Sequence, residues 1–424
     1  MVSVHGDDFL GEGTDVALDN LARVLLANFE VKVGPRVGPG FGARCRLLKR
    51  QLLWGPAGFG WLPDPRHVAR AAEALGLTTA KPAPTPAVRD SEAATPDGED
   101  ELDEKAAYTY RSVNGRLLYL SADRLDLQYG IKETSRGMSR PLQRDLVRLR
   151  RLVRYALGTG NLMLVFRYQA LPSEVRVAVD GDWAGDVRSR KSTSCDAAFF
   201  GDHLLESHAV SQQVIALSSA ESEFYAIGSG TASGLFFKHL LAEQGLEVNL
   251  AVVTDSSAAK TMVQRVGVGR VRHIEVRFLW VQEEQRKGNV EVRKTLGAEN
   301  VADLGTKPVT KETLARLMLK LPLVLPLEQD GWFPEPDGEQ QKQHEGEQKQ
   351  HEKNEQHQQK DPGQRTDPGQ QKDPGQRNDP GQQNDPDQPK DPNQQNDPDQ
   401  RNDPNQQRIP GKKVVLVNRG ARAQ

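Results

Sequence analysis

Residues 175–210 read VRVAVDGDWAGDVRSRKSTSCDAAFFGDHLLESHAV, and this stretch decides the fold class. Val175–Val179 alternates in the way typical of a half-buried strand, and two more strands are predicted over Thr193–Phe200 and Leu204–Val210. The last two are separated by the pair Gly201-Asp202, which favours a tight turn. The stretch therefore predicts three strands joined as antiparallel hairpins.

The sequence that follows predicts helices alternating with strands. Ser218-Ser-Ala-Glu221 matches a capping box, in which Ser218 accepts from the amide three residues on and Glu221 reaches back, and the helix is expected to end near Gly245. The later elements are expected to be a strand at 248–253, helices at 256–265 and 274–287, a strand at 290–294 and a helical turn from 301. This order predicts an α/β fold with a mixed five-stranded sheet and flanking helices.

Composition separates a folded part from a tail. Only 36% of the 424 residues are hydrophobic and the mean hydropathy is -0.65, which is too polar for a chain that is globular throughout. From Asp361 the chain repeats Asp-Pro every six residues with nothing apolar in the repeat, so residues 326–424 are predicted to be a disordered tail in which Val414–Val417 alone has burial potential. Residues 79–107, rich in proline and then in acidic residues, predict an extended linker.

Charge and cysteine content exclude several classes of protein. The formal net charge of -2 gives no general sign of a nucleic-acid partner, so any basic surface has to be local. Cys45 and Cys195 are too few for a disulfide framework or a cysteine-based zinc site, and they favour a reducing compartment. No apolar run is long enough to span a membrane, and the expectation is a soluble, intracellular protein, cytoplasmic or nuclear, with no membrane partner.

Four acidic residues lie where strands end or helices begin. Asp180 ends the first strand, Glu221 lies in the first turn of the first long helix, Asp255 follows the fourth strand and Asp303 begins the last helix. Each alone is also explained by helix capping or the helix dipole, but the ordered set predicts one site at a sheet edge. Such carboxylates would repel one another unless divalent ions held them, and two Mg²⁺ or Mn²⁺ ions suit phosphodiester hydrolysis.

The choice between the two glutamates of the first helix turn depends on helix geometry. If Ala220, Phe224 and Ile227 mark the face toward the core, Glu221 lies roughly 60° from that face and Glu223 roughly 100° from it. Glu221 is therefore the predicted ligand. If Glu221 is occupied in the capping box, Glu223 is the alternative.

Six blocks of the chain, in order, resemble the ribonuclease H domain of copia-type LTR retrotransposon Pol polyproteins. The blocks are residues 179–186, 190–194, 216–223, 254–255, 272–277 and 302–308. The resemblance implies that Asp180, Glu221, Asp255 and Asp303 bind two Mg²⁺ ions and cleave the RNA strand of an RNA:DNA hybrid. The chain departs from that family at Cys195, Ser256 and Glu275, where the family usually has Gly, Asn and Asp, and none of these is a predicted metal ligand.

The resemblance extends upstream. Residues 110–121 and 151–159 resemble the connection region, and Val4–Leu10, with Asp7 and Asp8, resembles the paired-aspartate hairpin of a reverse-transcriptase palm. The predicted organisation is a truncated palm remnant (1–78), the linker, a connection region (108–168), a ribonuclease H-like domain (169–325) and the tail. Polymerisation in that family needs a further palm carboxylate and the fingers, so reverse-transcriptase activity is not expected from this chain alone.

Substrate contacts are expected beside the carboxylates, because a hybrid presents two sugar-phosphate backbones. The candidate residues are Arg188, Arg190, Lys191, Ser192, Thr193, Arg272 and His273. For each cluster the alternative is an ordinary solvated turn, and for His273 it is a cap or packing residue.

Two other functions compete with the hybrid nuclease. One is a catalytically inactive retroelement remnant that only binds nucleic acid or a protein partner. The other is a transposase or integrase, in which the catalytic glutamate comes from a late helix. A glutamate in the first long helix favours the ribonuclease.

Overall fold

The computed structural model describes residues 1–326, apart from 7, 40, 42, 90–96 and 270, together with residues 412–418. The Asp-Pro repeat and Asp7 lie outside these ranges, so the structure does not bear on what was predicted for them. The described residues belong to one compact unit.

The predicted five-stranded sheet is present. Its strands are β8 (Glu174–Asp182), β9 (Thr193–Phe200), β10 (His203–Ser211), β11 (Asn249–Thr254) and β12 (Glu291–Lys294). They lie in the order β10-β9-β8-β11-β12, with β8, β9 and β10 antiparallel and β11 parallel to both β8 and β12. The fold class predicted from residues 175–210 is confirmed.

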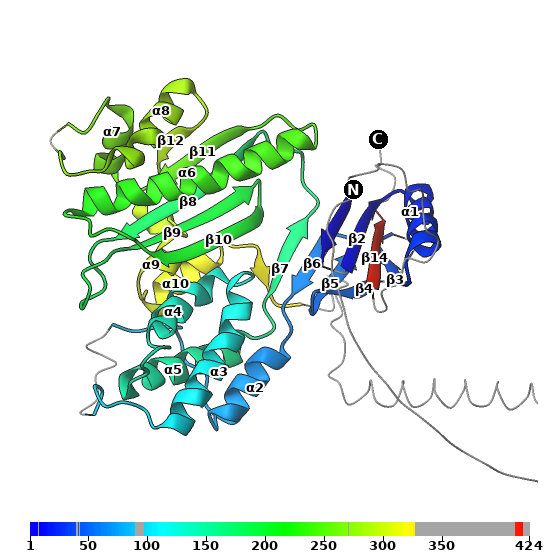
Figure 1. Cartoon of the computed structure of the whole chain (residues 1–424), viewed down its shortest axis with the longest axis horizontal. Coiled ribbons are helices and arrows are strands. Elements are labelled where there is room, and N and C mark those ends of the chain that lie inside the picture. The colour runs from blue at the N-terminus through cyan, green and yellow to red at the C-terminus, as the bar shows by residue number, and fades with distance from the viewer. Residues whose placement is uncertain are drawn as a thin grey trace, which may run out of the picture. The chain divides into compact units, whose positions relative to one another are not determined.

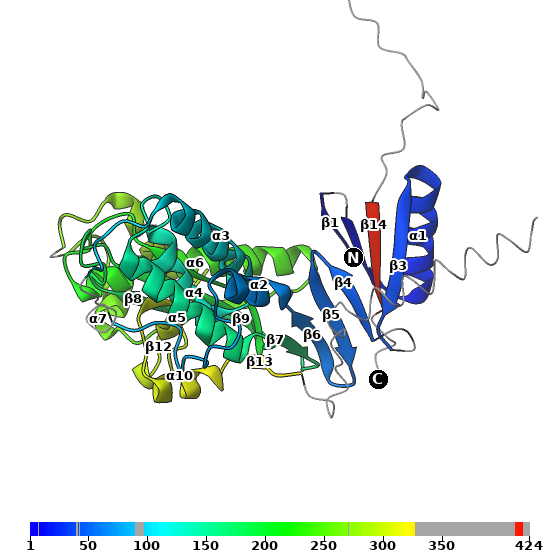
Figure 2. The same cartoon turned by 90° about the horizontal axis from the view of Figure 1, so that it is seen from below.

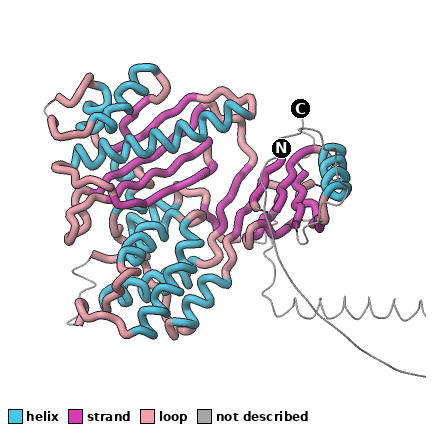
Figure 3. Tube along the Cα trace, viewed as in Figure 1, coloured by secondary structure: helices cyan, strands magenta, loops and turns pink. Residues whose placement is uncertain are grey.

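Helices cover both faces of this sheet because its strands alternate between two apolar sets. Val177 and Val179 face α6 (Ser219–Glu243), which lies across the sheet in Figures 1 and 3, with α7 (Ser257–Gln264) and α8 (Trp280–Lys287) beside it. Ala178 and Ala197 point to the other face, toward α9 (Asp303–Thr306) and α10 (Lys311–Met318). The helix expected at 274–287 starts as a 3₁₀ turn, η2 (Val276–Leu279), before α8.

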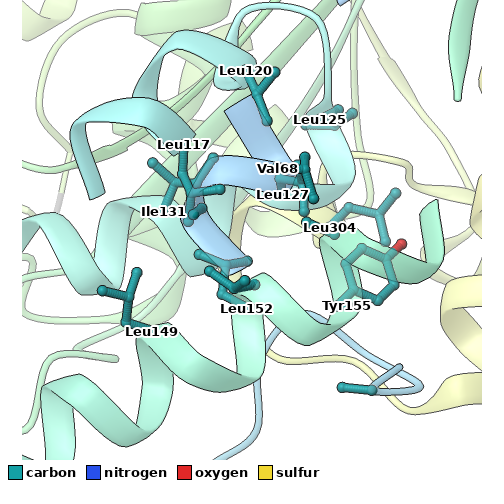
Figure 4. Packing of buried hydrophobic residues seen from close by; sticks show 14 of the residues in the cluster. Val68, Leu117, Leu120, Leu125, Leu127, Ile131, Leu149, Leu152, Tyr155 and Leu304 are labelled. Atoms are coloured by element: carbon teal, nitrogen blue, oxygen red, sulfur yellow. The ribbon is translucent and has the colours of Figure 1, made fainter. Parts of the chain in front are cut away.

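Four helices ahead of the sheet form a bundle that shares its core. They are α2 (Arg66–Ala74), α3 (Glu104–Ser121), α4 (Leu125–Arg136) and α5 (Gln143–Thr159), and their buried leucines are drawn in Figure 4. The same apolar cluster continues into Ala178, Ala197 and Leu304 of the sheet and α9. In addition, the Gln128 amide of α4 donates to the Ser207 carbonyl of β10 at 2.8 Å.

The predicted linker has no helix or strand over 79–89, but it is packed rather than free. The Arg154 side chain donates to the Lys81 carbonyl at 2.8 Å, and Arg151 donates to the Thr85 hydroxyl at 2.8 Å. Ala83 is buried, and its amide donates to the Arg154 carbonyl at 3.3 Å. These contacts from the arginines of α5 were not predicted from the sequence.

The residues ahead of α2 contribute strands to two further sheets, which later segments of the chain complete. The first comprises β1 (Val2–His5), β2 (Asp8–Gly13), β3 (Val31–Val37) and β14 (Lys412–Asn418), with α1 (Asp15–Asn28) packed on it. The second comprises β4 (Arg44–Leu47), β5 (Arg50–Gly55), β6 (Gly58–Leu62), β7 (Met163–Arg167) and β13 (Leu323–Val324). Its strands lie in the order β13-β7-β6-β5-β4 (Figure 2).

One part of the tail prediction is wrong, since residues 412–418 are a strand rather than disordered. β14 lies between β2 and β3 and pairs with both in parallel. The physical reason is that β2 and β3 are not paired with each other, so both offer open backbone edges to an extended segment. The apolar run at 414–417 is the part of the tail suited to such a position.

Candidate active site

Three carboxylates converge at one edge of the large sheet. Asp180 comes from β8, Glu223 from the first turns of α6 and Asp255 from the residue after β11, and one oxygen of each lies within 4.8 Å of the others. Asp180 is 2% exposed and Glu223 is 9% exposed. The strand order explains the meeting, because β8 and β11 are adjacent and parallel, so their carboxyl ends share an edge.

Asp303 lies beside this cluster but is not one of the three. The Lys307 ammonium is 2.8 Å from Asp303 Oδ1 and 3.4 Å from Asp180 Oδ2, so it bridges the two carboxylates. The Thr306 hydroxyl donates to the same Asp180 oxygen. Lys307 was missed in the sequence, although its position four residues after Asp303 is the spacing that places two side chains on one helix face.

The structure places Glu221 away from the three-carboxylate cluster, contrary to expectation. One Glu221 oxygen accepts from the Leu217 amide at 3.1 Å and lies 2.8 Å from His273 Nε2, and the other accepts from the Tyr225 hydroxyl at 2.7 Å. The Ser218 half of the predicted capping box is present, since the Glu221 amide donates to Ser218 Oγ at 3.2 Å, but the Glu221 carboxylate accepts from Leu217 instead of Ser218. Glu223, the alternative, is the residue that stands beside Asp180.

The error came from the apolar residues used to orient the helix. The face that meets the sheet contains Gly230 and Gly234, and a Cβ built at those positions would lie 2.3 Å from Val179 Cγ1 and from Leu250 Cδ1, respectively. Small residues therefore set the contact, and Glu223 precedes Gly230 by two helical turns on that same face. The prediction oriented the helix by large apolar residues such as Phe224, and this placed the expected contact face too far from Glu223.

The cluster is electrostatically unfavourable without a cation. Burial and the charges of Asp180 and Asp255 raise the pKa of Glu223 to about 9. Burial and the charge of Asp180 raise the pKa of Asp303 to about 7, and they also raise the pKa of Asp255. Metal-free protein is thus expected to hold protons on this cluster at neutral pH.

The donor set fits divalent cations. Asp180, Glu223 and Asp255 offer only carboxylate oxygens, which Mg²⁺ and Mn²⁺ prefer, and no imidazole or thiolate joins this group. A cation would also add positive charge beside these carboxylates, where Lys307 and, for Asp255, Lys294 already act. Asp182, whose pKa is raised by burial, lies close enough to Asp180 to feel its charge.

Thermal unfolding gives a direct test of cation binding. Mg²⁺ or Mn²⁺ at about a hundredfold above its dissociation constant is expected to stabilise the protein by about 2.7 kcal/mol and so raise the unfolding temperature. Asp180→Asn is expected to lose this rise, while Glu247→Gln, an exposed position outside the cluster, keeps it. Equal shifts in native protein and Asp180→Asn would contradict cation binding here.

The predicted substrate residues fall into two groups. Ser192 and Thr193 are buried: Ser192 Oγ accepts from the Ala184 amide at 3.0 Å and Thr193 Oγ1 from Lys132 Nζ at 2.5 Å, so both hold the β8–β9 loop. The other group is at least partly accessible and consists of Arg188, Arg190, Lys191, Arg272 and His273. Of these, Arg188 donates to Glu99 at 2.6 Å and His273 contacts Glu221.

Three further residues, in or beside the motif blocks and in the N-terminal hairpin, have places that the structure defines. Asp186 accepts from the Ser189 amide at 3.0 Å, which fits a turn residue, and it also pairs with Arg136. Ser256 caps α7 by accepting from the Ala259 amide at 3.2 Å. Asp8 lies at the start of β2 in the N-terminal hairpin.

The sheet order, the crossing helix and the acidic edge define a ribonuclease H-like domain. Among solved structures, similarity is found to RNase H1 of the archaeon Halobacterium salinarum (13% identity, TM-score 0.24, 31% of this chain and 93% of that one). It is also found to LC11-RNase H1 in complex with an RNA/DNA hybrid (10% identity, TM-score 0.23, 31% of this chain and 94% of that one). No family model matches the sequence.

Curated relatives indicate the origin of the chain. It is 24% identical over 322 residues to the retrovirus-related Pol polyprotein from transposon RE1 of Arabidopsis thaliana, covering 75% of this chain and 21% of that protein. It is 27% identical to the corresponding polyprotein from transposon TNT 1-94 of Nicotiana tabacum, covering 59% and 19%. Secreted RxLR effector protein 161 of Plasmopara viticola is 31% identical over 128 residues, 30% of this chain and 89% of that protein.

These matches confirm the resemblance to copia-type retrotransposon Pol polyproteins that the motifs predicted. It spans about a fifth of the length of the Pol polyproteins described above.

Proposed function

We propose that this chain is a metal-dependent ribonuclease H that cleaves the RNA strand of RNA:DNA hybrids, as part of a retrotransposon-derived polyprotein. The observation that carries the proposal is the convergence of Asp180, Glu223 and Asp255 within 4.8 Å on a ribonuclease H-like sheet. The proposed ligands are these three residues, with Asp303 as a fourth carboxylate beside Asp180. Glu223 takes the place first assigned to Glu221.

Each residue has a role that its position supports. Two bound Mg²⁺ ions, or Mn²⁺, would supply activation of the attacking water and stabilisation of the leaving oxygen. The short Thr306 contact and the Lys307 ammonium orient the Asp180 carboxylate. Lys307 also offsets negative charge until cations bind. His273 is 43% exposed and contacts buried Glu221, so it fixes the start of α6 and with it the position of Glu223.

The accessible basic residues are proposed to hold the hybrid. Arg190 follows the β8–β9 turn, where it adopts a left-handed backbone (φ 56°), and Arg272 is exposed next to His273. Backbone phosphates are the expected ligands of such side chains, and contacts to 2′-hydroxyls would select the RNA strand. Polymerase activity is not part of this proposal.

The proposal also includes an intracellular setting, cytoplasmic or nuclear, which the two buried, free cysteines suit. None of the helices in the described ranges has the length and apolar character needed to cross a membrane.

The test is a substrate panel of one sequence prepared as RNA:DNA hybrid, RNA duplex and DNA duplex, each incubated with Mg²⁺, Mn²⁺ or EDTA. Cleavage confined to the RNA strand of the hybrid, and absent in EDTA, is the expected result. Cleavage of all three duplexes would point to a nuclease of another specificity. No cleavage by folded protein with either metal would favour the alternative, a catalytically inactive remnant that only binds nucleic acid or a partner.

A further inference from the structure

A groove lined by arginines runs from α4 and α5 to the β8–β9 loop. It has a volume of about 550 Å³. Its lining includes five arginines and four acidic residues: Arg136, Arg140, Arg144, Arg148, Arg188, Glu99, Glu133, Asp145 and Asp186. We call it the arginine groove. The β8–β9 loop that forms one wall of the groove, residues 185–189, follows directly on β8, the strand that carries Asp180.

Residues 97–104, the acidic segment, supply negative charge to this groove. Glu99 contacts Arg144 of α5 with one oxygen and Arg188 of the β8–β9 loop with the other, the latter at 2.6 Å. Glu101 contacts Arg140, with Arg140 Nε 2.7 Å from Glu101 Oε1. Glu99 thus bridges α5 and the β8–β9 loop, which are two walls of the groove. Arg188, on the second wall, is one of the predicted substrate residues.

The backbone of the acidic segment is fixed while its side chains remain in solvent. The Arg144 amide donates to the Gly98 carbonyl at 3.1 Å, and the Gln143 amide donates to the Asp100 carbonyl at 2.9 Å. Glu99 and Glu101 are 70% and 55% exposed at the side chain. Glu99 can therefore leave its arginines by side-chain rotation alone, and exposed ion pairs of this kind are weak.

One donor of the Arg144 guanidinium is not used by these carboxylates. Arg144 Nε is buried without a hydrogen-bond partner in the described part of the chain, and it lies 3.8 Å from the Asp145 carboxylate. A guanidinium presents a fork of donors that matches phosphate oxygens. A row of guanidinium groups leading to a hybrid-cleaving centre is suited to a sugar-phosphate backbone, which brings one negative charge per nucleotide.

We infer that the arginine groove binds one sugar-phosphate backbone of the substrate, and that Glu99 competes with that backbone for Arg144 and Arg188. This inference rests on the proposed function for the identity of the substrate. When the substrate is absent, the Glu99 carboxylate pairs with both Arg144 and Arg188. When the hybrid arrives, a phosphate replaces the Glu99 carboxylate on each guanidinium.

The test is equilibrium binding of a labelled RNA:DNA hybrid to the full chain in EDTA, measured from low to moderate salt. Glu99→Gln is expected to tighten binding about three- to tenfold at low salt, since it removes the competitor and one like charge. Asp97→Asn is the matched control, because it removes the same charge from the same segment without touching the groove, and it is expected to change affinity less than about twofold. Arg144→Gln is expected to weaken binding and to lower the salt slope by about one.

Equal effects of Glu99→Gln and Asp97→Asn would overturn the inference, because general charge would then explain both. An unchanged salt dependence of hybrid binding in Arg144→Gln would also overturn the inference. The assay contains no metal and measures no turnover, so it separates the two proposals: a protein that binds in this pattern but never cleaves would refute only the nuclease function. A chain that cleaves hybrids but binds them equally well in all variants would refute only the groove.

Discussion

Replacing Glu223 by Gln is expected to reduce hybrid cleavage by at least about a hundredfold. The Glu223 carboxylate is one of three that lie within 4.8 Å of one another, and an amide in its place would remove a negative donor from the proposed cation site. The change keeps the volume of the side chain and resembles the protonated carboxyl that Glu223 is expected to carry in the metal-free protein at neutral pH, so loss of folding is not expected. Single-turnover cleavage of a labelled hybrid in Mg²⁺ measures the effect.

Glu221→Gln is the matched control, since it makes the same change two residues away. Glu221 binds the Leu217 amide, Tyr225 and His273 instead of the cluster, so its loss is expected to cost less than about tenfold in cleavage and to act through the start of α6. The reverse pattern, a large loss in Glu221→Gln and a small one in Glu223→Gln, would restore the first sequence assignment and show that the site geometry described above is wrong.

Arg124→Met is expected to lower the free energy of unfolding by about 3–5 kcal/mol. The Arg124 and Asp126 side chains are 2% and 0% exposed and paired at 2.7 Å, and Arg124 also donates to the Thr159 carbonyl at 2.7 Å. Removing the guanidinium leaves the Asp126 carboxylate buried with the Tyr155 hydroxyl still donating to it at 2.8 Å, but without a counter-charge. Urea unfolding followed by circular dichroism gives the change.

The double variant Arg124→Met with Asp126→Asn distinguishes two contributions to the lost stability: the loss of the ion pair itself, and the burial of an Asp126 carboxylate without a counter-charge. It removes the uncompensated carboxylate while leaving an acceptor for Tyr155, and it is expected to recover part of the stability lost in the single variant. A single variant as stable as the native chain would show that the pair contributes nothing to holding α4 against α5. If the double variant recovers no stability, the lower free energy of unfolding is due to lost packing and not to the uncompensated charge.

The sheet was predictable because its signals are local. The alternation in 175–179 and the turn at 201–202 fix three strands, and the mixed order follows from helical crossovers, so β9 begins and ends where the sequence predicted. The helical bundle was harder to predict from the sequence, because its apolar core is completed by residues far along the chain, such as Leu304 and Ala197. The strand at 412–418 depends on the open edges of β2 and β3, a tertiary circumstance that periodicity does not report.

The candidate site was predicted in part for a similar reason. Asp180 lies near the end of β8 and Asp255 follows β11, the adjacent parallel strand, so their convergence could be read from the element order. The choice between Glu221 and Glu223 depended on how closely α6 approaches the sheet, which Gly230 and Gly234 decide by being small. Ser192 and Thr193 were predicted as substrate contacts, but both are buried and contact Ala184 and Lys132 instead.

The central claim is that the carboxylate cluster around Asp180 cleaves the RNA strand of a hybrid. Its most direct test compares native chain with Asp180→Asn in Mg²⁺ on a hybrid labelled in the RNA strand, with folding of both proteins checked by circular dichroism. We expect cuts within the RNA strand by the native chain and none above background by the variant. Equal cutting by both folded proteins would contradict it, because the nuclease would then lie elsewhere.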